Sequence, residues 1–537
     1  MFHSYNCNYE LKTKIMAYQV RQVNKKTGVT YVYEAVSIWN KELKQARNKQ
    51  VCIGKIDPAT GKIIPSKRLS PQQAALRDPS VTATAQIVGP AVVLNELSKS
   101  TGLASLLKSC FPKTYRQILA MASYLALQGG ALSHCSSWAK SHEPDLATSL
   151  SSQRISEIIS SIGLDEKETF LVKWIKKALE NDYICYDITS ISSYSELNEF
   201  IKYGYNRDDE KLPQLNLAML FGQKTTLPLY YHRVPGSIND VSTLHNLVLT
   251  FKALELKRLH FVMDKGFYSK KNIDELVQHR DRFTIGIPLN NKWLQQAIDD
   301  IRESIHGPAG YRKLDDEILY VHSRLYPWGE ENRRCYLHLY YNASNHAKDI
   351  DSFNEELLQY KLEIESGKPV AEHKKAYADF LIQKRTPKRG LVVTYNNEAI
   401  SQHISRYAGF QALLSNGIKD PLEAIKVYRD KDVVEKCFDD LKNSLDMKRL
   451  RMHKSSTADG RLFIQFIALI LISELRQRMR TSGLIEKYTV RELLREMETF
   501  TKVTYTGKYG HIHTELTKAQ RDILKELKIE VPDMPSS

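Results

Sequence analysis

Two aspartates lie where a carboxylate is either costly or well placed to bind a ligand. Asp187 stands inside the apolar run 183–189, YICYDIT, where an ionised carboxylate is costly unless it is paired or binds a metal. Asp264 follows the apolar run 259–263 directly before a Lys-Gly pair, where the chain must turn, and ligands of α/β sheets gather at such strand ends. Each has a plainer interpretation, as a buried hydrogen-bonded group and as a turn residue respectively. Together they favour a site for a hard divalent cation, which requires convergent oxygen ligands.

A third carboxylate, Glu435, belongs to a long helix that the sequence predicts from Asp420 onward. The helix start is marked by Asp420 as N-cap, by Pro421 at the first helical position and by Glu423 three residues after the cap. One face of the helix is apolar and can pack onto a sheet; it carries Val434, Phe438, Leu441 and Leu445.

Polar side chains form a second face of the same helix. Tyr428, Lys431, Glu435 and Lys442 stand at offsets 0, 3, 7 and 14. At about 100° per residue, these four fall within a stripe roughly 60° wide. The stripe has two interpretations. It is either a solvated ladder of ion pairs, each worth tenths of a kcal/mol, or a metal ligand flanked by phosphate-binding groups.

The segment around the aspartates predicts a mixed α/β sheet. Strand-like runs occur at 183–189, 214–221, 227–232 and 259–264, with helical runs at 240–254 and 269–277. Three strands followed by alternating helix and strand are typical of such a sheet. Residues 182–290 thus form the first part of a core and residues 291–408 interrupt it. Residues 409–480 resume it with a buried strand at 409–415 and the helix of Glu435.

The N-terminal residues 1–75 predict a β-rich basic segment. Strand-like runs occur at 18–23, 30–39 and 50–56, and the segment is rich in lysine, with Tyr31, Tyr33 and Trp39 between the charges. It is either a small β unit that contacts DNA or a solvated basic face.

Residues 90–180 change to helical periodicity, which predicts a helical region. One helix begins at Ser151, whose hydroxyl can cap it, and its first turn carries Gln153 and Arg154. Because a recognition helix reads bases with its N-terminal residues, these two side chains are candidates for base contacts. The alternative is a plain capped helix. At the other end of the chain, residues 481–537 predict a C-terminal helical segment.

Composition indicates a globular chain with a polyanionic partner. The 537 residues carry 77 Lys+Arg against 62 Asp+Glu, a formal net charge of +15, and each neutralised phosphate would release counterions. The longest apolar run, 462–472, is too short to span a bilayer, and the first ten residues do not resemble a secretory signal. The seven cysteines form no C-x-x-C pair, which favours reduced thiols over disulfides or zinc; they are Cys7, Cys52, Cys110, Cys135, Cys185, Cys335 and Cys437.

The order of these motifs resembles that of bacterial and archaeal insertion-sequence transposases of the DDE superfamily. In one group of them, an RNase H-like core carries a large insertion before its Glu and has the signature Tyr-x2-Arg-x3-Glu-x6-Lys. Tyr428, Lys431, Glu435 and Lys442 match it, except that lysine replaces the usual arginine and cannot offer a bidentate guanidinium. Shorter runs are similar too, between about residues 30 and 475; they are IGKIDP (53–58), SQRIS (152–156), YDITS (186–190), PGS (235–237) with Asp240, and DKGFYS (264–269).

The resemblance implies a metal-dependent mechanism. Asp187, Asp264 and Glu435 would meet at one end of an RNase H-like mixed sheet and hold two Mg²⁺ about 3.5–4 Å apart, with Mn²⁺ as a substitute. The same site would cut the element's ends and join them to target DNA. Tyr428, Lys431 and Lys442 would hold a terminal phosphate.

The resemblance also implies partners. They are double-stranded DNA, both terminal inverted repeats and target, and a second protomer on paired ends, in the cytoplasm at the nucleoid. The group often flips a base against an aromatic residue, for which Trp328, Tyr326 and Tyr336 are candidates beside a role in core packing.

Two other classes of protein remain as alternatives. One is an RNase H-like nuclease without strand transfer, which would share the metal site. The other is a transposon-derived DNA-binding protein without catalysis, which loss of a carboxylate would favour. We expect the three carboxylates to lie within about 10 Å of one another if they share metals. We also expect residues 1–180 to carry the recognition of DNA ends.

Overall fold

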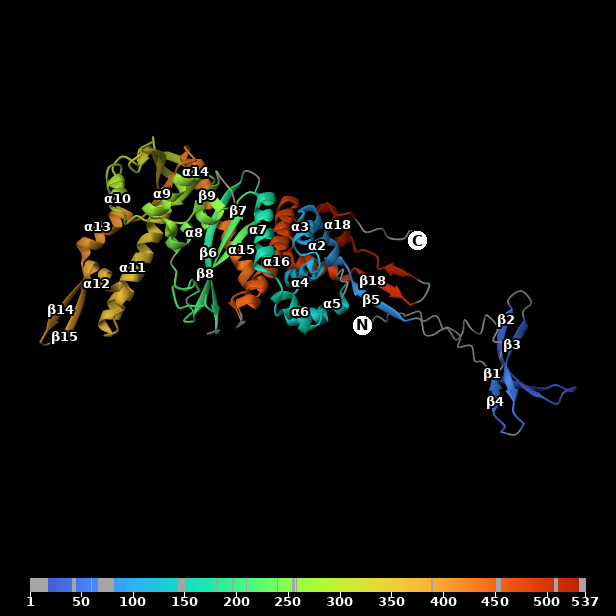
Figure 1. Cartoon of the computed structure of the whole chain (residues 1–537). Helices are drawn as coiled ribbons and strands as arrows, with labels where there is room; N and C mark the ends of the chain where they lie inside the picture. Colours follow the sequence, from blue (N-terminus) through green and yellow to red (C-terminus); the bar gives the residue numbers. More distant parts are fainter. Residues whose placement is uncertain are drawn as a thin grey trace, which may run out of the picture. The chain divides into compact units, whose positions relative to one another are not determined.

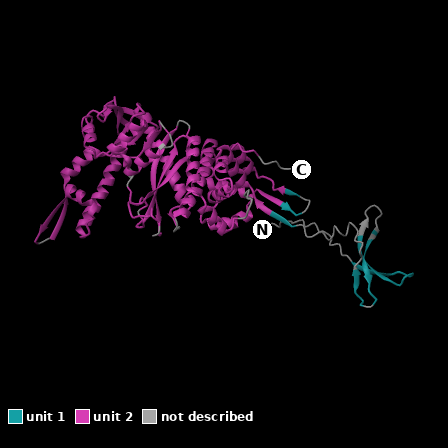
Figure 2. Cartoon of the chain, in the orientation of Figure 1, with its two compact units in different colours: residues 1–84, 504–511 teal, residues 85–503, 512–537 magenta. Residues whose placement is uncertain are grey.

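The computed structural model describes residues 18–40, 45–58, 60–65, 82–142, 150–179, 182–195, 198–208, 210–238, 240–253, 256, 258–387, 390–450, 455–506 and 510–530. The chain divides into two compact units, residues 1–84 with 504–511 and residues 85–503 with 512–537 (Figure 2). Each unit is considered by itself below.

The first unit contains a four-stranded antiparallel sheet in sequential order. Its strands are β1 (Tyr18–Val23), β2 (Thr30–Asn40), β3 (Gln45–Ile56) and β4 (Ile63–Pro65). The three strands predicted from sequence are present, and the third begins earlier than predicted. Gly28 makes the turn between β1 and β2 with a φ of 67°, a left-handed conformation that favours glycine.

The second unit is built on a large mixed sheet, as the sequence predicts. Its central strands are β6 (Tyr183–Ser193), β7 (Gln214–Gly222), β8 (Pro228–Pro235), β9 (His260–Met263) and β10 (Arg282–Gly286), in the order β8-β7-β6-β9-β10. β6, β7 and β8 form an antiparallel meander, β9 runs parallel to β6, and β10 runs parallel to β9. The short strand β17 (Arg449–Leu450) pairs with the end of β6.

Residues 291–408 extend this sheet and also add a lobe. Beyond β10 the order continues with β16 (Phe410–Ser415), β13 (Arg333–Tyr341), β12 (Glu317–Trp328) and β11 (Tyr311–Leu314), all antiparallel to their neighbours. The lobe lies between β13 and β16 in sequence. Its two ends meet, because the backbone N–H of Asn342 donates to the carbonyl of Gly409 at 2.9 Å.

The lobe has a small hydrophobic core of its own. Ile364, Tyr377, Leu381 and Val393 form that core, apart from the main one. In Figure 1 the hairpin β14–β15 lies at the end of the lobe away from the sheet. The lobe's elements are α11 (Ala343–Glu365), η3 (Ala371–His373), α12 (Lys374–Phe380), β14 (Leu381–Thr386), β15 (Gly390–Tyr395) and α13 (Asn397–Tyr407).

Helices cover both faces of the large sheet. On one face, the hydroxyl of Tyr186 donates to that of Thr243 at 2.9 Å. Thr243 lies on the helix that precedes β9. On the other, Tyr231 packs against Phe466 with ring centroids 5.0 Å apart. The first set comprises α8 (Asp240–Ala253), η2 (Lys265–Phe267), α9 (Lys270–His279) and α10 (Lys292–Asp299). The second includes α7 (Leu164–Ala178), α14 (Pro421–Arg429), α15 (Asp432–Asp439), the π-helical turn η4 (Asp440–Ser444) and α16 (Ser455–Ser482).

α16 is the central helix of the helical layer. All residues from 458 to 473 are buried, which explains the apolar run near 462–472. Gly460 lets α6 (Ser152–Ser160) approach closely, because a Cβ there would lie 2.1 Å from the carbonyl oxygen of Ile159. The other members of this region are α2 (Gly89–Ser100), α3 (Leu103–Cys110), α4 (Tyr115–Leu127), η1 (Leu132–His134) and α5 (Cys135–Ser141).

The C-terminal segment is not purely helical, contrary to the prediction for residues 481–537. Besides η5 (Leu484–Glu486), α17 (Val490–Glu496), η6 (Met497–Thr499) and α18 (Lys518–Glu526), it contains β18 (Thr501–Tyr505) and β19 (His511–His513). A further strand, β5 (Ala83–Ile87), precedes α2. The β-branched and aromatic run 501–505, TKVTY, is typical of a strand.

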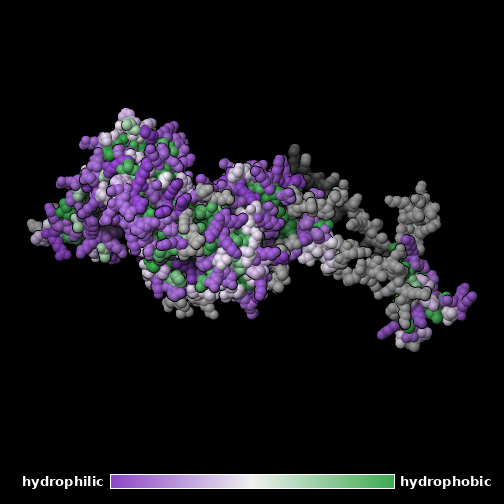
Figure 3. All heavy atoms as spheres, turned by 45° about the horizontal axis from the view of Figure 1, so that its top comes forward, coloured by the Kyte–Doolittle hydropathy of each residue, from purple (hydrophilic) through white to green (hydrophobic). Residues whose placement is uncertain are grey.

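The surface in view is mostly polar (Figure 3), and the described cysteines are not paired with one another. The view in Figure 3 is largely hydrophilic, with hydrophobic residues scattered among the polar ones. Cys7 lies outside the described residues, and the other six cysteines are free thiols, four of them buried. Among the described residues, no helix is both long and apolar enough to cross a membrane.

Candidate active site

The register of β6 and β9 brings Asp187 and Asp264 level with each other. The two strands run parallel with Tyr186 opposite Met263, so the next residue on each strand is an aspartate. Neighbouring strands lie about 4.8 Å apart, and level residues point to the same face. Asp187 also pairs with Met219, and Met219 with Tyr231, whose ring packs on α16. Both aspartates therefore face the helices α14 to α16; we name this side of the sheet the Asp187 face.

Burial makes the Asp187 carboxylate hard to ionise. It raises the pKa of Asp187 to about 6, and the negative charge of Asp264 adds to that increase. The backbone N–H of Ile188, which donates to Oδ1 at 2.8 Å, lowers the pKa, as do the charges of Arg207 and Lys431. A cation placed between the two carboxylates would relieve both the burial cost and the repulsion.

Asp264 is held in its ionised form by its neighbours. Burial raises the pKa of this carboxyl, but the hydroxyl of Tyr428 donates to its Oδ1 at 2.5 Å, and Lys431 and Lys265 add positive charge. The net result is a pKa below the ordinary value for aspartate. The contact depends on Gly286, because a Cβ there would lie 2.6 Å from the Tyr428 hydroxyl oxygen.

The helix that carries Glu435 begins as predicted but is not continuous. Asp420 caps α14 by accepting from the backbone N–H of Glu423 at 2.8 Å, with Pro421 in the first turn. The single long helix is wrong, because the chain tightens between α14 and α15. There the backbone N–H groups of Lys431 and Val434 bond to carbonyls three residues back, at 3.4 and 2.8 Å.

A second irregularity follows Glu435. Residues 440–444 form the π-helical turn η4, held by Arg476 on α16, which makes an ion pair with Asp440, and by Arg491, which donates to the carbonyl of Ser444. The regular spacing of 3.6 residues per turn therefore does not extend from Tyr428 to Lys442. The stripe that the sequence predicts for these residues is broken twice.

Lys431 is the shared neighbour of the three candidate carboxylates. Its charge lowers the pKa values of both Asp187 and Asp264, and its Nζ lies 3.8 Å from Oε1 of Glu435. The same ammonium lies 5.4 Å from the ring centroid of Tyr428. The Glu435 side chain is 66% exposed. In the part of the chain that the structure describes, no three His, Cys, Asp or Glu side chains form a metal-binding group, so the convergence of all three carboxylates stays a prediction.

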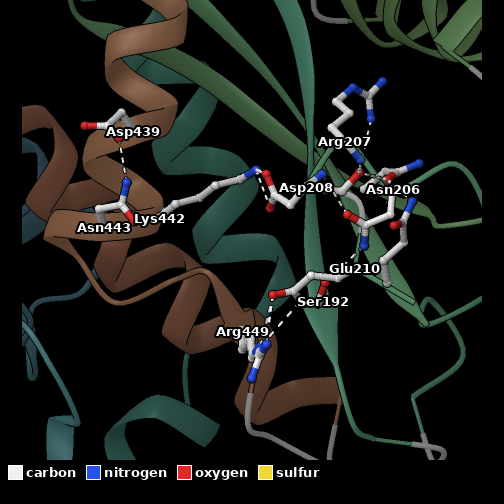
Figure 4. A network of polar contacts seen from close by, with 12 residues as sticks. Ser192, Asn206, Arg207, Asp208, Glu210, Asp439, Lys442, Asn443 and Arg449 are labelled. Atoms are coloured by element: carbon white, nitrogen blue, oxygen red, sulfur yellow. Dashed lines mark hydrogen bonds and ion pairs between the residues drawn. The ribbon is translucent and has the colours of Figure 1, made fainter. Parts of the chain in front are cut away.

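Lys442 is engaged by a loop that sequence reasoning missed. Its Nζ lies 2.7 Å from both carboxylate oxygens of Asp208, between β6 and β7 (Figure 4). Arg449 pairs with Glu210 of the same loop at 2.9 Å. Arg207 donates to the Ser190 hydroxyl at 3.3 Å, and its charge lowers the pKa of Asp187. The sequence signal that could have indicated this loop is the cluster of charged residues at 207–211, between the apolar strands β6 and β7.

Two cavities adjoin on the lobe side of Asp264. One, of about 1020 Å³, is lined by Asp264 and Tyr428 and by residues of the lobe, and it shares Pro288 and Asn290 with the other. The second, of about 590 Å³, is an aromatic pocket lined by Tyr268, Trp293, Tyr326 and Trp328.

The aromatic pocket contains two of the three aromatic candidates. The rings of Trp293 and Tyr326 lie 4.8 Å apart. Trp328 is buried and donates its Nε1–H to Asp274 at 2.7 Å, so it has a packing role as well. Tyr336 does not line this pocket but a different groove. Sequence reasoning missed Trp293, which stands early in the insertion.

Gln153 and Arg154 lie on the exposed side of α6. The Ser151 hydroxyl accepts from the Arg154 backbone N–H at 3.2 Å, which confirms the predicted cap. Both side chains contact Glu157 one turn on, Arg154 at 3.1 Å and Gln153 at 3.1 Å. Their exposure is compatible with base contacts, and their role in DNA binding stays a prediction.

Comparison with known proteins identifies a domain and a similar structure. The family model described as a transposase DDE domain matches residues 180–471, more than half of the chain. Among solved structures, a cryo-EM structure of a piggyBac transposase synaptic complex with hairpin DNA is similar with a TM-score of 0.33 and 10% sequence identity. That match covers 82% of this chain and 74% of the other. None of the curated proteins matches the chain.

Proposed function

Because this chain belongs to the DDE transposase family, we propose that Asp187, Asp264 and Glu435 are the residues with which it carries out transposition. The protein is a DNA transposase that cleaves DNA at transposon ends and transfers the cut strands to target DNA. The observation that carries the assignment is the register of β6 and β9, which sets two buried aspartates level on one face of the sheet. If Asp264 were only a turn residue and Asp187 only a buried hydrogen-bonded group, neither would need a second carboxylate beside it.

We further propose that the core is RNase H-like. An antiparallel three-stranded meander followed by two parallel strands, with helices between them, supports this assignment. The signature residues Tyr428, Lys431, Glu435 and Lys442 support membership in the bacterial and archaeal insertion-sequence group with a large insertion.

DDE transposases use divalent metal ions, and we propose Mg²⁺, with Mn²⁺ as a substitute. Asp187 and Asp264 fit such an ion, since these two hard oxygen ligands stand level on one face of the sheet and the charge of Asp264 raises the pKa of Asp187. When bound, the metal would activate the attacking hydroxyl and stabilise the departing oxygen. Glu435 would complete the ligand set after its ion pair with Lys431 opens.

The remaining residues position the DNA. Tyr428 keeps Asp264 ionised through its hydrogen bond, and Lys431, once released from Glu435, can contact a phosphate. Lys442 would contact another phosphate after leaving Asp208. The aromatic pocket beside the Asp264 cavity supports a flipped base stacked on Trp293 and Tyr326, with Trp328 as part of the wall.

Partners follow from the reaction. We propose that the duplex terminal repeats are recognised by residues 1–180, including Gln153 and Arg154, and that two protomers act on paired ends. The protein would then work in the cytoplasm, at the chromosome that carries its substrate.

The test uses purified full-length protein, its own element ends and Mg²⁺. We expect end cleavage followed by joining to a plasmid, both abolished in Asp264→Asn and unchanged in the control Glu355→Gln, an exposed carboxylate on α11. Cleavage without joining would favour the nuclease alternative. End binding without cleavage would favour the non-catalytic alternative.

A further inference from the structure

A groove of about 760 Å³ lies where β11, β12 and β13 meet the start of α14. Its walls include Arg312, Leu325, Arg334, Tyr336 and Lys419, and we name it the basic groove. These residues come from all three strands and from the loop before α14. None of these five residues has a role in the function proposed above; Tyr336, a base-stacking candidate from the sequence, lies here and not in the aromatic pocket.

Of the four cations that line the basic groove, Arg324 lies 3.6 Å from Asp300, whereas the other three have no acidic partner among the described residues. Arg312 donates to the backbone carbonyls of Ala309 and Tyr311, at 2.9 and 2.7 Å, and Arg334 lies 5.3 Å from the ring centroid of Tyr336. Within the described ranges, no carboxylate lies within ion-pair distance of Arg312, Arg334 or Lys419, and all three are exposed.

The two acidic side chains of the groove are already engaged. Asp420 caps α14, and Glu423 accepts from the Tyr183 hydroxyl at 3.1 Å. An excess of exposed, unpaired cations beside an aromatic ring fits a polyanion better than a protein partner.

The sheet register places the groove and the aspartates on the same face. Leu325 stands opposite Tyr336, Tyr336 opposite Ser415, and Ser415 opposite Thr284. The row continues through Val262 to Cys185, two residues before Asp187. Tyr336 thus lies three strands from β9, or about 14 Å. That distance corresponds to about four base pairs along B-DNA at 3.4 Å each.

We propose that the basic groove binds the phosphate backbone of target DNA during strand transfer. This inference rests on the proposed function. Strand transfer requires a second DNA beside the cleaved end, and the end is already assigned to the cavity and aromatic pocket on the lobe side of Asp264. The groove offers charges and one aromatic face, and phosphate contacts carry no sequence information, which suits a partner chosen with little regard to sequence.

The test separates the two steps of transposition. In the full-length double variant Arg334→Glu/Lys419→Glu, joining of pre-cleaved ends to plasmid should fall about tenfold or more, since two phosphate contacts become repulsive. End cleavage should stay within about twofold of the unchanged protein, because the cleaved DNA does not enter the groove. The matched control is Arg333→Glu, one residue away on β13 and on its opposite face, where Arg333 already pairs with Glu331 at 2.7 Å.

Two outcomes would overturn the proposal. An equal loss of cleavage and joining would show that the groove holds the element's end, and unchanged joining would show that it binds no DNA. The milder pair Arg334→Gln/Lys419→Gln should give the same pattern at smaller amplitude if charge reversal disturbs folding. Affinity for a non-specific duplex, measured by fluorescence anisotropy without metal, should fall in parallel. This readout stays informative even if the unchanged protein fails to cleave its ends, a result that would contradict the proposed function itself.

Discussion

The two sides of the candidate active site are built in different ways. On the sheet side, Asp187 and Asp264 are set by strand register, and neither has an arginine or lysine within ion-pair distance among the described residues. On the helix side, the candidate phosphate-binding lysines both hold carboxylates of the protein, Lys431 with Glu435 and Lys442 with Asp208. The sheet side is thus prepared for a cation, whereas the helix side is in an ion-paired arrangement without DNA. If metal and phosphate bind as proposed, they exchange with these internal partners before the site is complete.

The largest expected effect on activity comes from removing one carboxylate on each side of the site. Asp187→Asn and Glu435→Gln should each lower the rate of end cleavage by about 1000-fold or more, because each removes a proposed metal ligand worth several kcal/mol of transition-state stabilisation. End binding, measured by gel shift, should survive in both. If Glu435→Gln cleaves at the normal rate, Glu435 is only part of a surface ion pair with Lys431. Asp316→Asn, at an exposed position, is the control.

The second effect concerns the free energy of unfolding and is expected on the sheet side alone. Since the pKa of Asp187 rises to about 6 on folding, the folded state holds its proton at a pH where the unfolded state has released it. Stability without metal should therefore fall as pH rises from about 4 to 6 and stay level above that. Asp187→Asn should raise the free energy of unfolding at pH 7.5 by about 2 kcal/mol, because Asn removes the buried charge and can still accept from Ile188.

Denaturant unfolding in EDTA at pH 4.5 and pH 7.5 measures this effect. Glu435→Gln should change stability by less than about 0.5 kcal/mol, since its carboxylate is exposed. Equal free energies of unfolding for Asp187→Asn and the unchanged protein at pH 7.5 would show that the buried charge of Asp187 does not destabilise the fold.

A smaller effect tests the ion pair between Lys442 and Asp208. Lys442→Ala should weaken binding of the element's end about tenfold, the loss of one charge-assisted phosphate contact. Asp208→Asn should do the reverse and strengthen binding two- to fivefold, about 0.5–1 kcal/mol, because DNA no longer competes with a carboxylate for the lysine. Titrations by fluorescence anisotropy at fixed salt measure both. A loss of affinity in Asp208→Asn would mean that Asp208 orients Lys442 for DNA rather than occupying it.

The smallest effect concerns the Lys431 position. Lys431→Arg should keep the ion pair with Glu435 and allow bidentate phosphate contacts, so end affinity should rise by no more than about threefold. Lys431→Met should instead tighten Mn²⁺ binding, measured calorimetrically, because the internal cation near Asp187 and Asp264 is lost. Unchanged Mn²⁺ affinity would show that Lys431 and the metal do not compete.

The sequence predicted elements whose signal is local. The apolar runs around Asp187 and Asp264 marked their strands to within a few residues, and the Asp420-Pro421 pair marked the start of α14. Only the family resemblance implied that the two aspartates would lie side by side on neighbouring strands, since strand register depends on pairing across the sheet. That resemblance also supplied the role of Glu435, which the structure alone would not single out.

Features set by tertiary contacts escaped sequence analysis. The break at Lys431 and the π-helical turn at Asp440 interrupt a sequence with good helical periodicity, and the second is held by Arg476 and Arg491 from other helices. Arg207 acts on Asp187 only because its loop folds back along β6. The strands β11, β12 and β13 were obscured because the same inserted stretch continues directly into the helices of the lobe.

The meeting of the lobe's two ends at Asn342 and Gly409 makes it a replaceable module. Topologically, residues 343–408 are the connection of a hairpin between β13 and β16, which pair up to Tyr341 opposite Phe410. A two-residue Asn-Gly turn closes such a hairpin by itself. Because the lobe has a core of its own, exchanging it for that turn, or for the lobe of another protein, would leave the sheet's ladder complete. The same junction is therefore a natural point at which a foreign domain could be grafted onto the sheet that carries Asp187 and Asp264.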